Sequence, residues 1–248
     1  MVHERIALIS LSRPEVRNAV DRRVASALGR LVLELEASPS VWAVVLTGSG
    51  QAFCAGADLR ELAAGHIDGL RTEAGFAGFV DAPRTKPWIA AVNGPAIAGG
   101  FEIALACDFI VASREAVFAL PEVKRGLLPA AGGCFRLPRA LPRAIALELI
   151  LTGGTLDATR AFSLGLVNRV TDRDATVPTA IAFASVIAAN APLAVREALA
   201  IARLAHDLAP ESLVRLCLEA QARLERTHDF KEGPLAFIEK RSPQWSGC

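Results

Sequence analysis

The stretch WIAAVNGPAIAGGFEIALA at residues 88–106 decides the fold, because it joins a strand, a loop and a helix without interruption. Trp88 to Val92 is a continuous apolar run, the pattern of a strand that is covered on both faces. Asn93 to Gly100 supplies the glycine and proline that favour a loop, and Phe101 to Ala106 predicts a helix. Buried strand, glycine-containing loop and helix in this order are typical of α/β folds.

The same plan occurs upstream. VWAVVLT at 41–47 predicts a second buried strand, and a glycine-containing loop at 48–58 follows it. Closer to the N-terminus, Ile6 to Leu11 predicts an opening strand that ends before Pro14, since proline cannot continue a strand ladder. Asp21 is a predicted N-cap for an amphipathic helix whose apolar residues recur at helical spacing: Val24, Ala27, Leu28, Leu31, Val32 and Leu35.

The last third of the chain has a different pattern. Before it, further short strands are expected at 109–111 and 117–119 and a helix at 143–151. From Ala175 onward the pattern is helical, with Pro192 and Pro210 at helix starts and Gly233-Pro234 expected to break the final helix. The sequence therefore predicts an α/β core at residues 1–190 and a helical appendage at residues 191–248.

Composition limits the class of protein. The chain is 52% hydrophobic and 21% charged, with no run of about eighteen apolar residues and no charged-then-apolar leader, which predicts a cytoplasmic protein without a membrane partner. The net charge is +1 from 27 basic and 26 acidic residues, with no block of one sign, so no nucleic-acid partner is expected. The mean hydropathy of +0.35 favours an oligomer, because sister subunits cover apolar surface.

No metal or redox site is predicted. The five cysteines form no CxxC pair and the four histidines show no HxxxH or HxH spacing, so neither a metal site nor a disulfide framework is indicated. Surface or packing roles fit the histidines better: His3, His66, His206 and His228. The chain also has no phosphate-loop, dinucleotide-binding or nucleophile-elbow pattern, which removes three large enzyme classes.

Two loops have features that can stabilise negative charge. FCAGADL at 53–59 and NGPAIAGGFE at 93–102 place small residues where a strand passes into a helix, so backbone N–H groups there can approach a ligand. Two such loops on adjacent strands can point two N–H donors at one oxygen. Their glycines also fit tight turns or close helix-to-sheet packing, and Asp58 fits an ordinary helix N-cap.

Two carboxylates are the stronger signal for chemistry. Glu102 lies within an apolar helical segment and Glu122 follows Leu120-Pro121, so burial is expected to disfavour the charged form of each. Two carboxylates in one dry site have their pKa values pushed apart, which leaves one as an acid and the other as a base. On local grounds alone, Glu122 fits an exposed acid near a helix start equally well.

Three ordered motifs together resemble the crotonase superfamily: FCAGADL at 53–59, NGPAIAGGFEIALACD at 93–108 and ALPEVKRGLLPAAGG at 119–133. The resemblance extends from the opening strand to EGPLAFIEKR at 232–241 and is weakest at 61–85. It implies a crotonase-like ββα spiral core at 1–190 and a C-terminal helical trimerisation region at 191–248. A homotrimer or a dimer of trimers is the assembly that this family resemblance implies.

The resemblance also implies an activity. Ala57 and Gly99 match the positions whose N–H groups hold the thioester oxygen in this family, and Glu102 and Glu122 match the two glutamates of its hydratases. Isomerases of the family usually keep only the second glutamate, so the pair favours an enoyl-CoA hydratase. In that role Glu102 deprotonates the water and Glu122 supplies the C2 proton. No metal or redox cofactor is implied, and coenzyme A enters only as part of the acyl-CoA thioester substrate.

The same resemblance assigns residues to the coenzyme A moiety. Its adenine is expected near the first loop, at Ala55, Ala57, Asp58 and Leu59. Arg17 is expected to help with the phosphates. Phe237 and Lys240 are expected to complete the site, either in the same chain or from a neighbouring subunit.

Three alternatives stay open. The three motifs most resemble those of the crotonobetainyl-CoA hydratase (carnitinyl-CoA dehydratase) branch. The substrate of that branch carries a trimethylammonium group, which needs an aromatic cage or an acid, and the chain has no tyrosine to build such a cage. The other two are an enoyl-CoA isomerase and a non-catalytic acyl-CoA-binding or RNA-binding relative. The chain also has Ala98 and Ala130 where many hydratases carry glycine, and the added methyl groups can narrow the acyl pocket.

Overall fold

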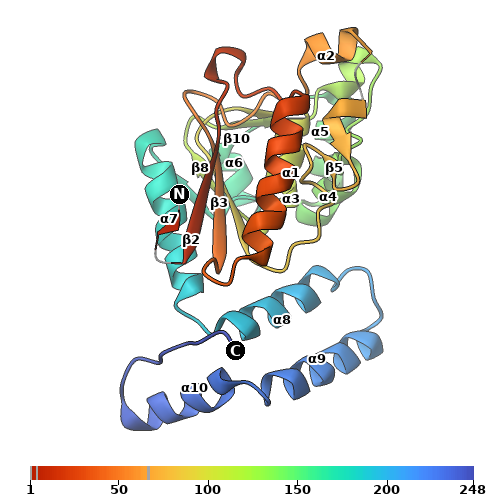
Figure 1. The fold of residues 1–248 in the computed structure, drawn as a ribbon. Helices are drawn as coiled ribbons and strands as arrows, with labels where there is room; N and C mark the ends of the chain where they lie inside the picture. Colours follow the sequence, from red (N-terminus) through yellow and green to blue (C-terminus); the bar gives the residue numbers. More distant parts are fainter. Residues whose placement is uncertain (1, 4, 66–67) are drawn as a thin grey trace.

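The computed structural model describes residues 2–3, 5–65 and 68–248, so His66 lies outside the described residues. Its centre is a six-stranded sheet in the order β1-β2-β3-β6-β8-β11 (Figure 1). The strands from β2 onward run parallel, and β1 pairs antiparallel with β2. Their bounds are β1 Val2–His3, β2 Ile6–Leu11, β3 Ala43–Gly48, β6 Trp88–Val92, β8 Phe109–Ser113 and β11 Arg169–Thr171. The opening strand and the strand at 88–92 match the predicted bounds, which confirms the α/β expectation.

Helices cover both faces of this sheet. α1 (Arg22–Ala37) and α7 (Arg173–Ala188) lie on opposite sides of β2 and β3 (Figure 1). The predicted cap of α1 is confirmed, because the Asp21 carboxylate accepts the Val24 N–H at 2.8 Å. On the α7 side, Ala180 and Ala184 of the helix are fully buried against apolar residues of the sheet that include Ile6, Val45 and Ile89. The larger core lies on the other side, between the sheet, α1 and the central helix α3 (Gly99–Ala106).

A second, smaller layer lies over the ends of the central strands. β7 (Ala96–Ile97) pairs parallel with β9 (Val117–Ala119), and β9 pairs antiparallel with β10 (Thr155–Asp157). The hairpin β4 (Arg71–Thr72) and β5 (Gly75–Phe76) lies against α1. The remaining core elements are η1 Pro14–Val16, α2 Leu59–Ala63, η2 Asp68–Leu70, η3 Glu122–Arg125, α4 Gly133–Ala140, α5 Arg143–Thr152 and α6 Ala158–Ser163.

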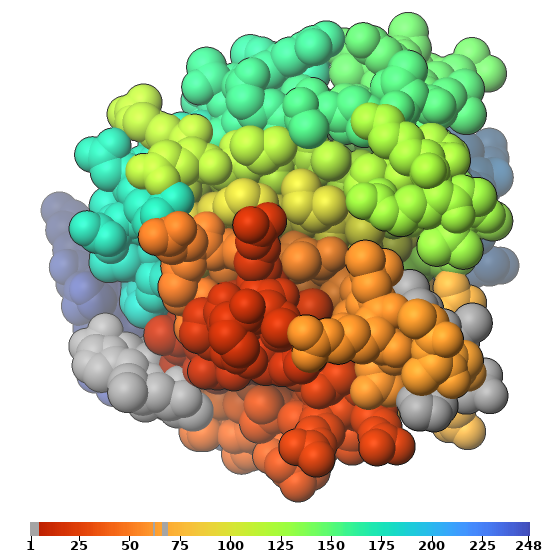
Figure 2. Space-filling view, turned by 90° about the horizontal axis from the view of Figure 1, so that it is seen from above, coloured from red at the N-terminus to blue at the C-terminus, as the bar shows by residue number. Residues whose placement is uncertain are grey.

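Three helices at the C-terminus stand apart from the sheet. α8 (Pro192–Arg203), α9 (Pro210–Leu224) and α10 (His228–Glu239) form a layer at one end of the molecule (Figure 1). Seen from the opposite end, they appear only at the edges, behind the core (Figure 2). The expected break at Gly233-Pro234 is wrong, since α10 runs through both residues. A proline removes only its own N–H, and the carbonyl that it leaves free belongs to Phe230, an exposed residue that water reaches.

Within the described ranges, the structure contains no single helix that is both long enough and apolar enough to cross a membrane. By length and composition alone, α7 and α8 pass that test as a pair, with a bend of 105° between them.

Candidate active site

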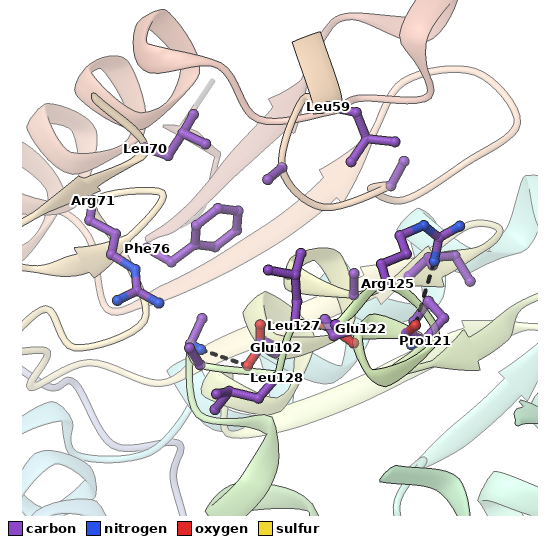
Figure 3. A pocket seen from close by; sticks show the side chains of 18 residues that line it. Leu59, Leu70, Arg71, Phe76, Glu102, Pro121, Glu122, Arg125, Leu127 and Leu128 are labelled. Carbon is purple, nitrogen blue, oxygen red and sulfur yellow. Dashed lines mark hydrogen bonds between the residues drawn. The ribbon is translucent and has the colours of Figure 1, made fainter. Parts of the chain in front are cut away.

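A cavity of about 400 Å³ opens where the first loop, the N-terminus of α3 and the segment around η3 meet (Figure 3). Most of its wall is apolar, and the charged side chains among its described residues are two glutamates and two arginines. The cavity is lined by Ala55, Ala57, Leu59, Leu70, Arg71, Phe76, Ile97, Ala98, Gly99, Glu102, Pro121, Glu122, Arg125, Gly126, Leu127, Leu128, Ala130 and Ala131. Residues from both predicted loops and both predicted carboxylates therefore share one site.

The first loop, at 53–59, is held in place by backbone hydrogen bonds to Val20. Val20 donates its N–H to the carbonyl of Gly56 at 2.7 Å and accepts the N–H of Asp58 at 2.8 Å. This isolated bridge leaves the N–H of Ala57, between them, without an acceptor among the described residues. Gly56 reaches this geometry with a φ of 87°, a conformation that an L side chain rarely adopts.

The second N–H belongs to Gly99, the first residue of α3. A helix leaves its first N–H groups without intrahelical partners and carries partial positive charge at that end. The cap before it is Ala98, whose φ of 52° and ψ of −128° are strained for a residue with a side chain. A Cβ built on Gly56 lies only 2.9 Å from the Gly99 nitrogen, so the two loops touch at this point. The geometry brings two N–H groups that have no partner in the described part of the chain to one wall of the cavity.

Glu102 lies in the first turn of α3 and is 3% exposed. Its Oε1 accepts the N–H of Ala131 at 2.7 Å and the N–H of Gly133 at 2.8 Å. Burial raises the pKa of this carboxyl, while the two N–H donors work in the opposite direction by stabilising its charged form. One oxygen is thus fixed by the backbone, and Oε2 is the oxygen that stays available in the site.

Glu122 begins η3, next to Glu102 in the cavity (Figure 3). Burial, with the nearby Glu102 carboxylate as a smaller contribution, raises its pKa from 4.5 to about 7. Its Oε2 is buried and has no hydrogen-bond partner among the described residues. A buried polar oxygen without a partner is rare in folded proteins, so Glu122 has the features of a group whose hydrogen-bond partner is a bound substrate.

Of the residues assigned to coenzyme A, Ala55, Ala57 and Leu59 line the cavity. Asp58 lies beside it, where its carboxylate binds the Arg13 guanidinium at 3.1 Å and accepts the N–H of Arg60 at 3.1 Å. This is the helix-cap arrangement expected for Asp58, and it leaves the side chain occupied.

The other assigned residues lie outside the cavity wall. Arg17 is exposed, and its carbonyl accepts the N–H of Ala55 at 3.0 Å, so its backbone adjoins the first loop. Phe237 and Lys240 belong to α10 and its C-cap, at the opposite end of the molecule from α2 and β5 (Figure 1). Within one chain, neither of these two residues comes to the cavity.

Sequence reasoning missed the larger side chains of the wall. Leu70, Arg71 and Phe76 come from the segment 61–85, which carries no motif, and the loop after η3 adds Leu127 and Leu128. The available signal was RTEAGF at 71–76, in which Gly75 takes a φ of 77° and permits the hairpin between β4 and β5. Among the described residues, no group of three or more His, Cys, Asp or Glu side chains is arranged to hold a metal ion.

Known proteins are similar in sequence to this chain over nearly its full length. A carnitinyl-CoA dehydratase of Proteus mirabilis is 41% identical over 246 residues, covering 96% of this chain and 94% of the relative. A mevalonyl-coenzyme A hydratase of Aspergillus fumigatus is 39% identical over 245 residues, covering 97% of this chain and 91% of the relative. Both relatives are named as enzymes that add or remove water at an acyl-CoA.

Solved structures share the fold. An enoyl-CoA hydratase of Mycobacterium tuberculosis superposes with a TM-score of 0.96 at 42% identity, covering 100% of this chain and 98% of that chain. A carnitinyl-CoA hydratase of Mycobacterium avium gives a TM-score of 0.79 at 44% identity, covering 100% and 97%. The expected crotonase-like fold is confirmed by these matches. The family model described as enoyl-CoA hydratase/isomerase matches residues 2–248, and the chain therefore belongs to the enoyl-CoA hydratase/isomerase family.

Proposed function

We propose that this chain is an enoyl-CoA hydratase, a hydro-lyase that reversibly adds water to the 2,3 double bond of a 2-enoyl-CoA thioester. The observation that carries the proposal is a single cavity in which two buried carboxylates with raised pKa values face two unpartnered N–H groups. Hydration needs an oxyanion site, a base for water and an acid for carbon, and these four groups are of the right kinds. The hydratase and dehydratase names of the relatives support the same reaction class.

The proposed reaction begins at the two N–H groups. Ala57 and Gly99 polarise the thioester carbonyl and stabilise the enolate oxygen that develops when water attacks C3. Glu102 accepts a proton from the water as the new C–O bond forms, and Glu122 donates a proton to C2 as the enolate collapses. In the dehydration direction the two proton transfers are reversed. Both are acid–base steps that carboxylic acids supply, so we propose no metal or redox cofactor.

The state of each carboxyl supports this division of roles. The donors from Ala131 and Gly133 favour an ionised Glu102, which a base must be. A pKa of about 7 keeps a large share of Glu122 protonated at neutral pH, as an acid must be. The two environments differ, because backbone donors hold Glu102 Oε1 while Glu122 Oε2 has no partner among the described residues, and such a difference supports one base and one acid in the same site.

We propose that coenzyme A lies along the first loop, with Ala55, Ala57, Asp58 and Leu59 near its adenine and Arg17 near its phosphates. Phe237 and Lys240 then belong to the site of a neighbouring subunit, because α10 is distant from the cavity of its own chain.

The proposed assembly is a homotrimer or a dimer of trimers through residues 191–248. Phe237 is 86% and Ile238 75% exposed, and Val214 and Leu218 on α9 are also largely exposed, which supports burial against another subunit. Light scattering after gel filtration tests this, since the monomer of 26.2 kDa should be absent at micromolar concentration. From charge and composition, we also propose a cytoplasmic protein with no nucleic-acid or membrane partner.

The first experiment follows the absorbance of the conjugated thioester when the protein meets crotonyl-CoA. We expect rapid loss of absorbance, and a decrease of about 10²- to 10⁴-fold in kcat for Glu122→Gln, the usual contribution of a general acid. Glu148→Gln is the matched control, because Glu148 is exposed on α5 outside the cavity. If the wild type consumes 3-enoyl but not 2-enoyl esters, the protein is an isomerase. If it binds esters and consumes none, it is a non-catalytic relative.

A further inference from the structure

Arg71 on β4 is a charged side chain in the cavity wall that the proposed hydration does not use. The residue is exposed, and among the described residues its side chain makes no hydrogen bond and no ion pair. Its charge does act on Glu102, which it helps to keep ionised. An arginine with all of its donors available in a substrate cavity is equipped to bind an anion.

The position of Arg71 is fixed relative to the oxyanion site by a short chain of contacts. Arg71 and Phe76 are directly opposed partners in the hairpin of β4 and β5, so their side chains share one face. The Phe76 ring in turn lies over Gly99, where an added Cβ would come within 2.5 Å of Phe76 Cε1. Arg71 is therefore the direct cross-strand neighbour of Phe76, the residue that covers the proposed thioester position.

The two cavity arginines lie on opposite sides of the glutamate pair. In Figure 3, Arg125 lies on the same side as Leu59, while Arg71 lies on the other side with Phe76 and Leu70. In the proposed function, coenzyme A runs along the first loop past Leu59. The acyl group then extends from the thioester in the other direction, along apolar residues and toward the guanidinium of Arg71.

We propose that Arg71 selects a 2-enoyl-CoA whose short acyl chain ends in a carboxylate. The inference rests on the proposed function and names its substrate class. Among the described residues of the wall, Phe76 alone is aromatic, so these residues form no cage for a quaternary ammonium group, and Arg71 repels that charge. A guanidinium and a carboxylate instead form paired, charge-assisted hydrogen bonds. This substrate class differs from the one in the name of the carnitinyl-CoA dehydratases.

Three esters that differ only beyond C4 test the proposal. Crotonyl-CoA ends there in a methyl group, glutaconyl-CoA adds a carboxylate, and crotonobetainyl-CoA adds a trimethylammonium group. Because Arg71 is partly screened by water, we expect kcat/KM for glutaconyl-CoA to exceed that for crotonyl-CoA by about tenfold rather than more. Crotonobetainyl-CoA should be the poorest of the three.

Variants identify the side chain responsible. Arg71→Gln should bring the glutaconyl to crotonyl ratio to about one, and Arg71→Glu should move the preference toward crotonobetainyl-CoA. Arg125→Gln is the matched control, since it removes the other arginine of the same wall and should leave the ratio unchanged. If Arg71 serves only to keep Glu102 ionised, Arg71→Gln will alter the pH profile for every ester equally and keep the ratio, which overturns the proposal.

A binding measurement separates this inference from the proposed function. Glutaryl-CoA and butyryl-CoA are saturated counterparts that cannot be hydrated, and calorimetry gives a Kd for each. We expect glutaryl-CoA to bind more tightly to the wild type and equally with butyryl-CoA to Arg71→Gln. Absence of turnover with every ester removes the hydratase assignment but leaves this comparison valid. Equal Kd values for the two esters in the wild type refute the role of Arg71 whether or not the protein is active.

Discussion

The substitution Gly56→Ala tests the proposed oxyanion site directly. The added Cβ would lie 2.9 Å from the Gly99 nitrogen, about 0.5 Å short of ordinary van der Waals contact at 3.4 Å. It would also lie 3.0 Å from the carbonyl oxygen of Ile97 and 3.1 Å from the Cβ of Ala98. All three are atoms of the loop that begins α3, so this loop must move away and take the Gly99 N–H with it.

The expected loss of activity follows from that displacement. Removal of one oxyanion donor typically lowers kcat by about 10²- to 10³-fold, and a misplacement of about 1 Å in reacting groups can lower it about 10²-fold. Alanine at a φ of 87° also costs roughly 1–2 kcal/mol of folding free energy. We therefore expect a folded but slow enzyme whose KM for crotonyl-CoA changes much less than its kcat.

Gly165→Ala is the control for strain alone. Gly165 has a similar φ of 83°, but a Cβ there meets no atom within 4 Å, and the residue lies outside the cavity wall. Both variants should lose stability in urea denaturation, and only Gly56→Ala should lose turnover. A folded Gly56→Ala protein with kcat within tenfold of the wild type would show that the Gly99 N–H is not needed in the transition state.

Further predictions concern the carboxyl groups and the C-terminal tail. Burial raises the pKa of Glu122 from 4.5 to about 7, so between these pH values the folded chain binds more protons than the unfolded chain. The contribution of Glu122 to the free energy of unfolding therefore falls as pH rises through this range. Glu122→Gln should remove that fall in urea titrations across the window, and equal slopes for both proteins would contradict it. Gly133→Ala places a Cβ 2.7 Å from Pro129 Cβ and 3.2 Å from Glu102 Oε1, so we expect a loss of about 1–3 kcal/mol of stability together with slower hydration, measured by denaturation and by the crotonyl-CoA assay. Asp229 is buried and accepts both Ser246 donors and the Gly247 N–H, so Asp229→Ala should make the tail after α10 sensitive to limited proteolysis while the core stays resistant.

The parts of the fold that the sequence predicted are those set by local pattern. Buried strands such as 88–92 read as apolar runs, and the Asp21 cap is a side chain that bonds three residues ahead. The short strands β10 and β11 gave no such signal, because neither TLD nor RVT is a continuous apolar run and each strand exists through pairing with a distant segment. The break expected at Gly233-Pro234 failed for the opposite reason, since the cap at Thr227 and the turns on both sides of Pro234 outweigh one local breaker.

The site divides in the same way. Ala57, Gly99, Glu102 and Glu122 lie in recognisable motifs, and the fold brings all four into one cavity. Arg71 lies in no motif, and its place in the cavity depends on the hairpin of β4 and β5, which hydrophobic periodicity does not predict. The residues proposed for the reaction were therefore predictable from their motifs, while Arg71 and other wall residues outside the motifs required the three-dimensional structure.

Two backbone N–H groups bind one oxygen of Glu102, so the isosteric replacement by glutamine changes more at this position than the charge. In Glu102→Gln, the amide oxygen must take the place of Oε1, because an NH₂ group there would face the donors of Ala131 and Gly133. The NH₂ group is then fixed at the position of Oε2. A water molecule at that position would meet a donor where it needs an acceptor, and it would have to rotate so that a lone pair points at the amide instead of at the substrate. Glutamine at this position therefore inverts a dipole as well as removing a base.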